Sequence, residues 1–284
     1  MKSCLAIVNQ KSYGGGKIPK QAVENYLKDY QIFWQEDNPL SLSHDALFIC
    51  GGDGTFNVAL NRESNLSKDI FYLPCGTLND KAHCYKRGKG QALVTGQADG
   101  ARFGYVLACG TFTAIGYTAK EEVKKKCKRL AYCLQALKEY KVHKIKATFS
   151  KEGKTYSGEY TLILVIKSKY CFGFPFNRLY SAEKEEGHIL LIKSPKRTNL
   201  LGKIKIFFPL FRAFFLGFGK EYHSKNMDFL HFNRGLLELS EEIPFCIDGD
   251  KKIFVKKQIP LSFQKHNGNF TLCKLNKRKG KIES

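Results

Sequence analysis

The sequence predicts an α/β protein in which an N-terminal domain built on a parallel sheet precedes a mostly antiparallel, β-rich domain. In the first hundred residues, short apolar runs alternate with segments of helical periodicity, which is typical of a parallel sheet covered by helices. Beyond residue 142 the pattern turns to strands and hairpins. A chain of 284 residues can hold two domains. We expect them at residues 1–104 and 105–273, with the tail 274–284 available to pack back on the first.

The N-terminal elements follow from the spacing of apolar residues. Cys4–Asn9 is a short apolar run that suits a buried strand. Pro19–Tyr30 carries apolar side chains at helical spacing, with a proline near its start. Gln31–Trp34 predicts a second strand, and Leu47–Cys50 and Ile70–Leu73 predict two more. Each of these last two runs leads into a glycine-containing turn.

The C-terminal half is predicted to be mainly antiparallel. Lys144–Ser150 and Tyr156–Ile166 alternate in polarity around Lys151–Lys154, which is typical of a hairpin. A long amphipathic helix is expected before them, at Lys120–Tyr140. Further strands are expected at Ile189–Lys193, Leu236–Leu239 and Pro244–Ile247.

The first glycine-containing turn is Gly51-Gly52-Asp53-Gly54-Thr55. Its glycines let backbone amides approach a ligand closely, and amides at a helix N-terminus form an anion site. A carboxylate inside a phosphate-binding loop repels the phosphates unless a cation lies between them, so Asp53 predicts Mg²⁺. The alternative is a purely structural glycine turn that Asp53 caps.

A second turn repeats this arrangement. Pro74-Cys75-Gly76-Thr77 follows an apolar run, and Asn79-Asp80 then opens a helix. Asp53 and Asp80 are separated by about the length of one βαβ unit, so both turns should emerge at the same edge of a parallel sheet. Two Gly-Thr turns and two carboxylates facing one crevice suit a metal-bound nucleoside triphosphate.

These two motifs, GGDGTFN and LPCGTLNDKA, resemble the catalytic-domain signature of the diacylglycerol kinase and bacterial lipid kinase family, which is related to sphingosine and ceramide kinases. NAD kinases and phosphofructokinases also carry a GGDG-type loop, but the Gly-Thr-x-Asn-Asp partner favours lipid kinases. The resemblance implies a nucleotide-binding domain of the NAD kinase/diacylglycerol kinase type and a second domain that is a β-sandwich. It extends to Ala6–Lys11, Gly116–Ala119, Arg129–Tyr132 and Ile247–Asp250.

The resemblance implies ATP and Mg²⁺ as cofactors. Asp53 and Asp80 would organise the catalytic Mg²⁺, through water because this ion dehydrates reluctantly. Asp80 has an alternative role as a helix cap with Asn79, and Lys11 could be an ordinary surface lysine. The predicted nucleotide contacts are Asn9, Lys11, Gly51, Gly52, Asp53, Gly54, Thr55, Asn57, Gly76, Thr77 and Asn79.

The base for the attacking hydroxyl must be a carboxylate near the acceptor. By resemblance to the family's Asp-Gly-Glu motif, this role falls on Asp250, with Asp248 beside it. Asp is about one methylene shorter than Glu, so either the backbone moves closer, or a water bridges, or activity is reduced. A tight Asp-Gly-Asp turn is also a common structural hairpin.

Two departures concern the second domain. The family's Asp-Gly-Leu-Leu element, which supports a structural Mg²⁺ in bacterial members, is replaced by Glu186-Gly187-His188-Ile189. Glu186, with the carbonyl groups of Glu183 and His188, is the candidate for retaining that ion. The usual Asn-Ser after the central strand is Lys167-Ser168.

The net charge of +21 points to anionic partners such as acidic lipid headgroups, nucleotides or nucleic acid, although it could also be general basicity. No helix-turn-helix, zinc or RNA-binding motif accompanies the charge, so nucleic acid is not expected. The ten cysteines form no C-x₂-C pair, which argues for reduced thiols. The apolar run at the N-terminus is too short for a signal peptide. The nearly uncharged run Ile206–Gly219 is too short to span a membrane.

An aromatic stripe lies at Ile204–Phe218. Helical spacing places Phe207, Phe211, Phe214 and Phe218 on one face, which Phe208 and Phe215 extend. Such a stripe is either core, or it borders an acyl-chain slot or rests on a bilayer with help from Lys203, Lys205 and Arg212.

The sequence therefore predicts a lipid kinase that transfers the γ-phosphate of ATP to a lipid hydroxyl, with diacylglycerol as the default acceptor. Its expected partners are a membrane lipid and the anionic inner face of the cytoplasmic membrane, to which it would bind peripherally. The resemblance also allows a homodimer. The alternatives are a nucleotide-cofactor kinase of the NAD kinase type and a catalytically weakened nucleotide- or lipid-binding regulator.

Overall fold

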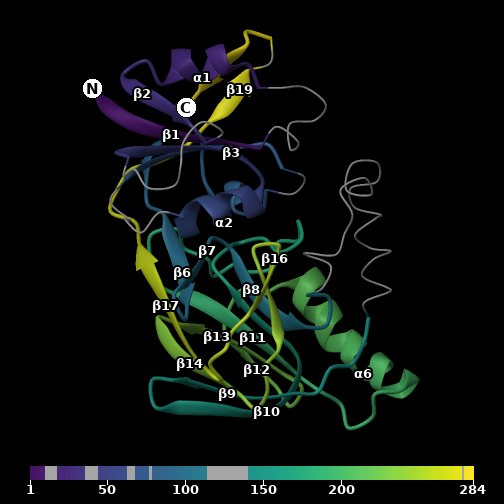
Figure 1. The fold of residues 1–284 in the computed structure, drawn as a ribbon. Helices are drawn as coiled ribbons and strands as arrows, with labels where there is room; N and C mark the ends of the chain where they lie inside the picture. The colour runs from purple at the N-terminus through teal and green to yellow at the C-terminus, as the bar shows by residue number, and fades with distance from the viewer. Residues whose placement is uncertain (10–17, 36–43, 63–67, 77–78, 114–139, 277) are drawn as a thin grey trace.

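The computed structural model describes residues 1–9, 18–35, 44–62, 68–76, 79–113, 140–276 and 278–284. Two sheets lie one above the other in Figure 1, and helix α2 (Asp53–Arg62) lies between them. The upper sheet has six strands and is mostly parallel, and the lower sheet has twelve strands and is antiparallel. The predicted fold class, α/β with a parallel sheet followed by a larger antiparallel one, is confirmed.

The six-stranded sheet has the order β2-β1-β3-β4-β18-β5. All neighbours are parallel except the pair β18 and β5. Cys50 of β3 pairs with Leu73 of β4, and Gly51 with Pro74, so the two strands end side by side, as predicted. The strands are β1 (Lys2–Val8), β2 (Tyr30–Trp34), β3 (Ala46–Gly51), β4 (Asp69–Pro74), β5 (Gly88–Gln91) and β18 (Phe270–Leu272).

Apolar side chains bury both faces of this sheet. Helix α1 (Lys20–Tyr26) packs on one face together with a small hairpin, β19 (Lys274–Asn276) and β20 (Lys281–Glu283), and α2 packs on the other. Helix α1 is shorter than predicted because the chain must turn before β2. Helix α2 begins at Asp53, within the glycine turn, so the turn itself supplies the first helical residues. The second motif opens only a 3₁₀ turn, η3 (Ala82–Cys84).

The antiparallel sheet curls around an apolar core. Its main path is β12-β13-β11-β10-β9-β14-β17-β6-β7, and β8 joins β10 to β15. The hairpin β9–β10 turns at Glu152-Gly153, both with positive φ, which confirms the predicted hairpin. The strands are β6 (Val94–Ala98), β7 (Ala101–Phe103), β8 (Val106–Gly110), β9 (Ile145–Lys151), β10 (Lys154–Ile166), β11 (Gly187–Lys193), β12 (Tyr222–His223), β13 (Met227–Phe232), β14 (Arg234–Leu239), β15 (Pro244–Ile247), β16 (Asp250–Ile253) and β17 (Gln258–Lys265).

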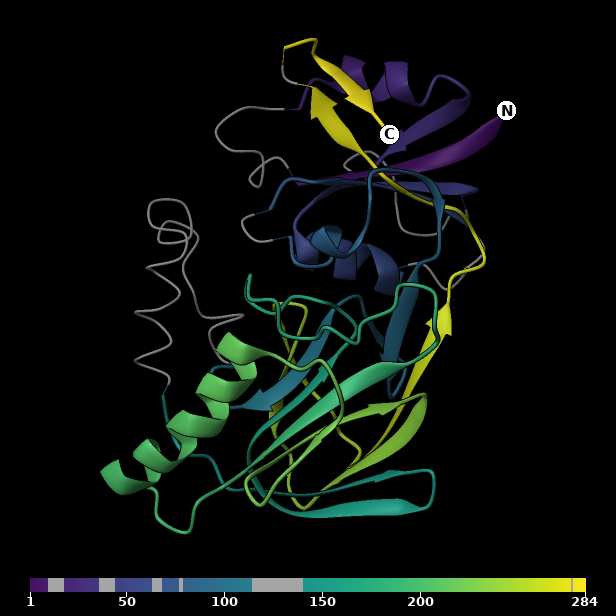
Figure 2. The same ribbon diagram turned by 180° about the vertical axis from the view of Figure 1, so that it is seen from behind.

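The chain passes between the sheets twice. It leaves the upper sheet after β5, enters the lower one at β6, and returns after β17 to insert β18 between β4 and β5. Figure 2, from behind, shows this return as a yellow strand that runs up from the lower sheet. The domain boundary at 104/105 remains a prediction, and the tail 274–284 belongs to the hairpin beside α1.

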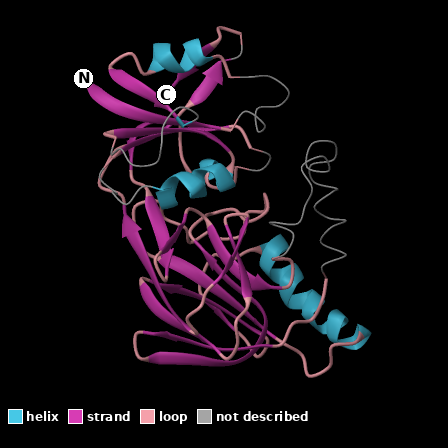
Figure 3. Ribbon diagram, viewed as in Figure 1, coloured by secondary structure: helices cyan, strands magenta, loops and turns pink. Residues whose placement is uncertain are grey.

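Helix α6 (Leu200–Phe211) lies along the outside of the lower sheet (Figure 3). It continues into η4 (Arg212–Leu216), a π-helical turn. Because a π turn holds more residues than an α turn, it rotates the side chains that follow out of the expected register. The predicted single aromatic face is therefore wrong. Phe214 and Phe218 are buried, whereas Phe207, Phe208, Phe211 and Phe215 are exposed.

No helix among the described residues is long and apolar enough to cross a membrane. The cysteines in the described part of the chain are free thiols, as the sequence indicates. The predicted helix at 120–140 falls almost entirely outside the described residues.

Candidate functional site

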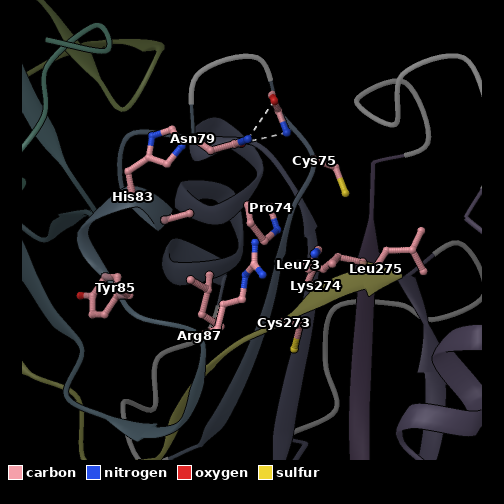
Figure 4. Close-up of a pocket in the computed structure, with 13 residues that line it drawn as sticks. Leu73, Pro74, Cys75, Asn79, His83, Tyr85, Arg87, Cys273, Lys274 and Leu275 are labelled. Carbon is pink, nitrogen blue, oxygen red and sulfur yellow. Dashed lines mark hydrogen bonds between the residues drawn. The ribbon is translucent and has the colours of Figure 1, made fainter. Parts of the chain in front are cut away.

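The two glycine turns meet through their backbones. A Cβ atom on Gly76 would lie 2.4 Å from the Cα of Gly52, so no larger residue fits at Gly76 without separating the loops. Asn79 fixes the second loop: Gly76 N–H donates to its Oδ1 at 2.8 Å, and its Nδ2 donates to the Gly76 carbonyl at 2.8 Å (Figure 4). Asn79 adopts a positive φ of 54°, which this residue type tolerates.

Asp53 joins the same two loops through its carboxylate. Its Oδ2 accepts from the Asp80 N–H at 2.9 Å, and its Oδ1 accepts from the Lys81 N–H at 3.2 Å. Burial, the Asp80 charge and the Asp248 charge together raise the pKa of Asp53 to about 7. A cation would relieve this accumulation of negative charge. Among the described residues no group of three or more His, Cys, Asp or Glu side chains gathers around Asp53, so the Mg²⁺ expected at Asp53 and Asp80 stays a prediction.

The end of β1 completes the rim of the first loop. Asn9 Nδ2 donates to Thr55 Oγ1 at 3.2 Å, and the Asn9 N–H donates to the Cys50 carbonyl at 2.8 Å. The amides of the first turn of α2, including Gly54 and Thr55, lie at the helix end where an anion is favoured. The predicted contacts Lys11 and Thr77 lie outside the described residues.

Asp248 and Gly249 form the two-residue turn between β15 and β16, with φ of 49° and 105°. The Asp248 carboxylate accepts from the N–H groups of Gly104, Tyr105 and Val106, the latter two at 2.9 and 2.7 Å. Burial nevertheless raises its pKa to about 6. Because three backbone N–H groups donate to the Asp248 carboxylate, Asp248 holds the β15–β16 hairpin in place.

Asp250 has a different environment. It is the first residue of β16, is exposed, and borders a groove with Asn57 and Arg102. The turn that carries it lies close to α2, since a Cβ on Gly54 would lie 3.7 Å from the Asp248 carbonyl oxygen. The structure thus places Asp250 at an exposed position beside the middle of α2, and its role as the base stays a prediction.

Asn57 links α2 to the antiparallel sheet. Its Nδ2 donates to the Arg102 carbonyl at 2.8 Å and to Asp248 Oδ2 at 3.0 Å. Both amide hydrogens are thus engaged by protein groups, and the predicted contact between Asn57 and the nucleotide remains a prediction.

Asp80 makes a second link between the sheets. It is fully buried, and its two oxygens accept from the Gly173 N–H at 3.0 and 3.2 Å. Burial raises its pKa. Sequence analysis missed Gly173, which follows Asp80 by 93 positions and has no motif around it. The role of Asp80 at the metal remains a prediction.

The candidate structural metal site has a different arrangement from the one expected. Lys167 Nζ donates to the carbonyl groups of Ser181 at 2.8 Å and Lys184 at 2.7 Å, so an ammonium already lies in this loop. Glu186 lies 3.7 Å from Lys184 Nζ. His188 is buried, contacts Asn177 and stacks on Phe229.

Within the described residues, no group of three or more His, Cys, Asp or Glu side chains could hold a metal ion. The structural Mg²⁺ predicted at Glu183, Glu186 and His188 therefore stays a prediction. The sequence did indicate a change at this loop, because Lys167 stands where the family usually has asparagine.

Two cavities flank these residues. One, of about 570 Å³, opens beside the second loop and is bordered by the basic side chains of His83, Arg87 and Lys274 (Figure 4). The other is a small, mainly apolar cavity of about 30 Å³, and Gly249, Phe112, Phe172 and Phe214 of η4 are among the residues that line it.

Residues 4–100 match the family model of the diacylglycerol kinase catalytic domain. The chain is also similar to solved structures from Bacillus anthracis str. Sterne. One, described as a candidate diacylglycerol kinase, is 16% identical with a TM-score of 0.68, and the similarity covers 95% of this chain and 96% of that one. Another, described as a diacylglycerol kinase, is 14% identical with a TM-score of 0.62, at 95% and 96% coverage. No curated protein sequence matches. The resemblance inferred from the two motifs is confirmed over residues 4–100, and the solved structures support the fold.

Proposed function

We propose that this chain, whose residues 4–100 match the diacylglycerol kinase catalytic domain, is an ATP- and Mg²⁺-dependent lipid kinase. The observation that carries the proposal is the backbone contact between Gly52 and Gly76, with the Asp53 carboxylate bridging the two loops. Two amide-rich turns and a buried carboxylate at one point suit the triphosphate of a metal-bound nucleotide.

The donor side would work mainly by positioning. The amides of the first turn of α2 would hold the phosphates, with Asn9 and Thr55 at the rim. Asp53 would hold Mg²⁺ through water, and that ion would neutralise charge on the transferred phosphate. Asp80 would keep the second loop aligned through its contact with Gly173. The basic cavity bordered by Arg87 and Lys274 offers space for the rest of the nucleotide.

The acceptor side would supply the base. Asp250 would accept the proton of the lipid hydroxyl as its oxygen attacks the γ-phosphorus, and the bond to the β-phosphate oxygen breaks. Asp248 would hold the turn that presents Asp250. The match of residues 4–100 to the diacylglycerol kinase catalytic domain supports a lipid over a nucleotide acceptor. Diacylglycerol is the default acceptor, and the enzyme would act at the inner face of the cytoplasmic membrane.

The test is to incubate the protein with γ-labelled ATP and a total lipid extract, and to identify the labelled product. We expect a labelled phospholipid. Asp53→Ala should abolish both transfer and nucleotide binding. Asp250→Asn should lower kcat at least about 100-fold and leave nucleotide binding intact, and Asp250→Glu should retain activity. Asp99→Asn, at a surface turn, is the matched control.

The same assay separates the alternatives. A labelled water-soluble nucleotide would identify a kinase of the NAD kinase type. ATP binding that depends on Asp53, without transfer to any fraction of the extract, would identify a regulator.

A further inference from the structure

Helix α6 and the turn η4 present an exposed apolar face, which we call the α6 face. It consists of two rows in which residues are four apart, so each row runs along one side of the helix. One row is Leu200, Ile204 and Phe208, and the other is Phe207, Phe211 and Phe215. Phe208 is 66% exposed and Phe215 is 60% exposed. Large apolar side chains that gather on one surface mark an interaction site.

The α6 face is not needed to hold the helix on the protein. The opposite side of the helix is buried against the lower sheet through Ile206, Leu210, Ala213 and Phe214. The exposed rings instead pack on each other, with centroids 5.8 Å apart for Phe207 and Phe211 and 4.9 Å for Phe211 and Phe215. Among the described residues, the helix is thus apolar on both sides and buried on one, which leaves the α6 face for a partner.

The charge around the α6 face identifies the chemistry of that partner. The sequence from His188 to Lys220 contains no Asp or Glu, and it carries Lys193, Lys196, Arg197, Lys203, Lys205, Arg212 and Lys220. Exposed aromatic residues on a helix that also carries Lys203 and Lys205, in a segment without acidic residues, match an interface between lipid headgroups and acyl chains. A second copy across a two-fold axis would instead bring these cations against one another, which disfavours a dimer through the α6 face.

We infer that the α6 face is the surface by which this protein docks on an anionic lipid bilayer. Phe207, Phe208, Phe211 and Phe215 enter the boundary of headgroups and acyl chains, and the lysines meet anionic headgroups. The inference deepens the proposed function and rests on it for the choice of a bilayer. Phe214 and Phe215 are neighbours in η4, and they point to opposite sides: Phe215 is exposed, and Phe214 is buried in the apolar core beneath the helix. Docking therefore leaves Phe214 in the protein interior while Phe215 meets the bilayer.

The first experiment measures binding to vesicles without ATP. The full-length protein is mixed with vesicles of equal parts phosphatidylcholine and phosphatidylglycerol, or of phosphatidylcholine alone. We expect binding to the mixed vesicles, weakened at least about tenfold by the double variant Phe208→Ser/Phe215→Ser. Val255→Ser, which removes an 84% exposed apolar side chain between β16 and β17, is the matched control and should bind as the wild type does.

The charge is tested separately. Lys205→Gln should weaken binding to the mixed vesicles about fivefold, whereas Lys146→Gln, at an exposed position on β9, should not. Unchanged binding of the double phenylalanine variant, or equal binding to vesicles without phosphatidylglycerol, overturns the inference. A wild-type dimer that the double variant converts to a monomer, with vesicle binding unchanged, assigns the α6 face to a second copy and also overturns it.

Kinase assays distinguish this inference from the proposed function. The double variant should lose transfer to diacylglycerol in vesicles, and it should keep transfer to a short-chain diacylglycerol in detergent. If the wild type phosphorylates no acceptor in either form, while vesicle binding still depends on the phenylalanines, the proposed function fails and the docking surface stands. A melting temperature equal to that of the wild type confirms that the variant is folded.

Discussion

Helix α2 exposes its N-terminal end at the candidate site, whereas helix α6 exposes one side along its length. Helix α2 lies between the two sheets and presents its N-terminal end, where Asp53, Gly54 and Thr55 form the first turn. Helix α6 lies outside the lower sheet and presents its side, with a row of exposed rings. The contacts of α2 are short and polar, through Asn57 to Arg102 and Asp248. Those of α6 are mainly apolar, through Ile206 and Leu210.

Under the proposed function and the inferred docking surface, this difference suits two kinds of ligand. A phosphate needs amides and charges at fixed distances, so the end of α2 is held by hydrogen bonds from both sheets. A lipid surface needs area more than geometry, so the side of α6 need only be exposed and supported from below. Near α2, we expect the replacement of a single atom to change stability or ATP binding strongly. On α6, we expect the effect of a substitution on stability to depend on which side of the helix it alters.

Asp248→Asn should have the largest effect, because it breaks the polar network around α2. The amide would place an NH₂ group among N–H donors and leave some of them unpaired in the interior. We expect a loss of about 4 kcal/mol in the free energy of unfolding, measured with urea at about pH 8, where the wild-type carboxyl is ionised. Asp99→Asn, on the surface, should change it by less than about 1 kcal/mol. Equal effects of the two variants would contradict the buried network.

Phe214→Ala and Phe215→Ala compare the two sides of η4 at adjacent positions. Phe214 packs on Phe172 and Phe176, so its truncation should destabilise the protein by about 3 kcal/mol in urea unfolding. Phe215 is mostly exposed, and its truncation should change stability by less than about 0.5 kcal/mol. The reverse order would mean that the π turn does not rotate these side chains as described.

Gly76→Ala tests the contact between the two loops. The added methyl would overlap the Cα of Gly52, so the loops must separate by a fraction of an ångström or more. We expect the dissociation constant of ATP to rise about 100-fold in calorimetric titration, since a small displacement of phosphate-binding amides is costly. Gly219→Ala, where an added Cβ would meet nothing within 4 Å, should leave ATP binding unchanged. ATP binding at the wild-type level in Gly76→Ala would refute the shared site.

Lys167 should give the smallest effect, visible as a pH dependence. Burial, with the nearby Lys81 charge, lowers the pKa of Lys167 to about 7. The unfolded chain keeps the proton up to about pH 10, so between these values it binds more protons than the folded protein. Stability from this group therefore rises with pH, by up to about 1.4 kcal/mol per unit. Relative to Lys167→Met, the wild type should gain stability from about pH 7 to pH 9 in urea unfolding, and parallel curves would contradict this.

The position of Lys167 also predicts how the protein responds to removal of metal ions. Because the Lys167 Nζ donates to the Ser181 and Lys184 carbonyls, we expect chelation by EDTA to leave the melting temperature of the protein without nucleotide unchanged. A fall in the melting temperature that Mg²⁺ reverses would indicate a structural ion at Glu186.

Local pattern was enough to predict that the two glycine loops meet. β3 and β4 are apolar runs that end in glycine turns, and parallel neighbours must bring such ends together. Contacts between distant segments could not be predicted, because no local pattern marks them: Asp80 meets Gly173, and Asp248 meets the turn at Gly104. The faces of α6 were assigned wrongly because a single π turn shifts the register.

The position of β18 has a consequence for how the protein is made. Residues 270–272 lie between β4 and β5, which are complete within the first 91 residues. During translation, the sheet that carries both glycine loops must therefore wait until residues 270–272 have left the ribosome, about 180 residues after β5. Until then β4 has an unpaired edge, and such an edge invites pairing with other chains. The fold thus couples the completion of the loop-bearing sheet to the synthesis of the whole antiparallel sheet that precedes β18 in the sequence.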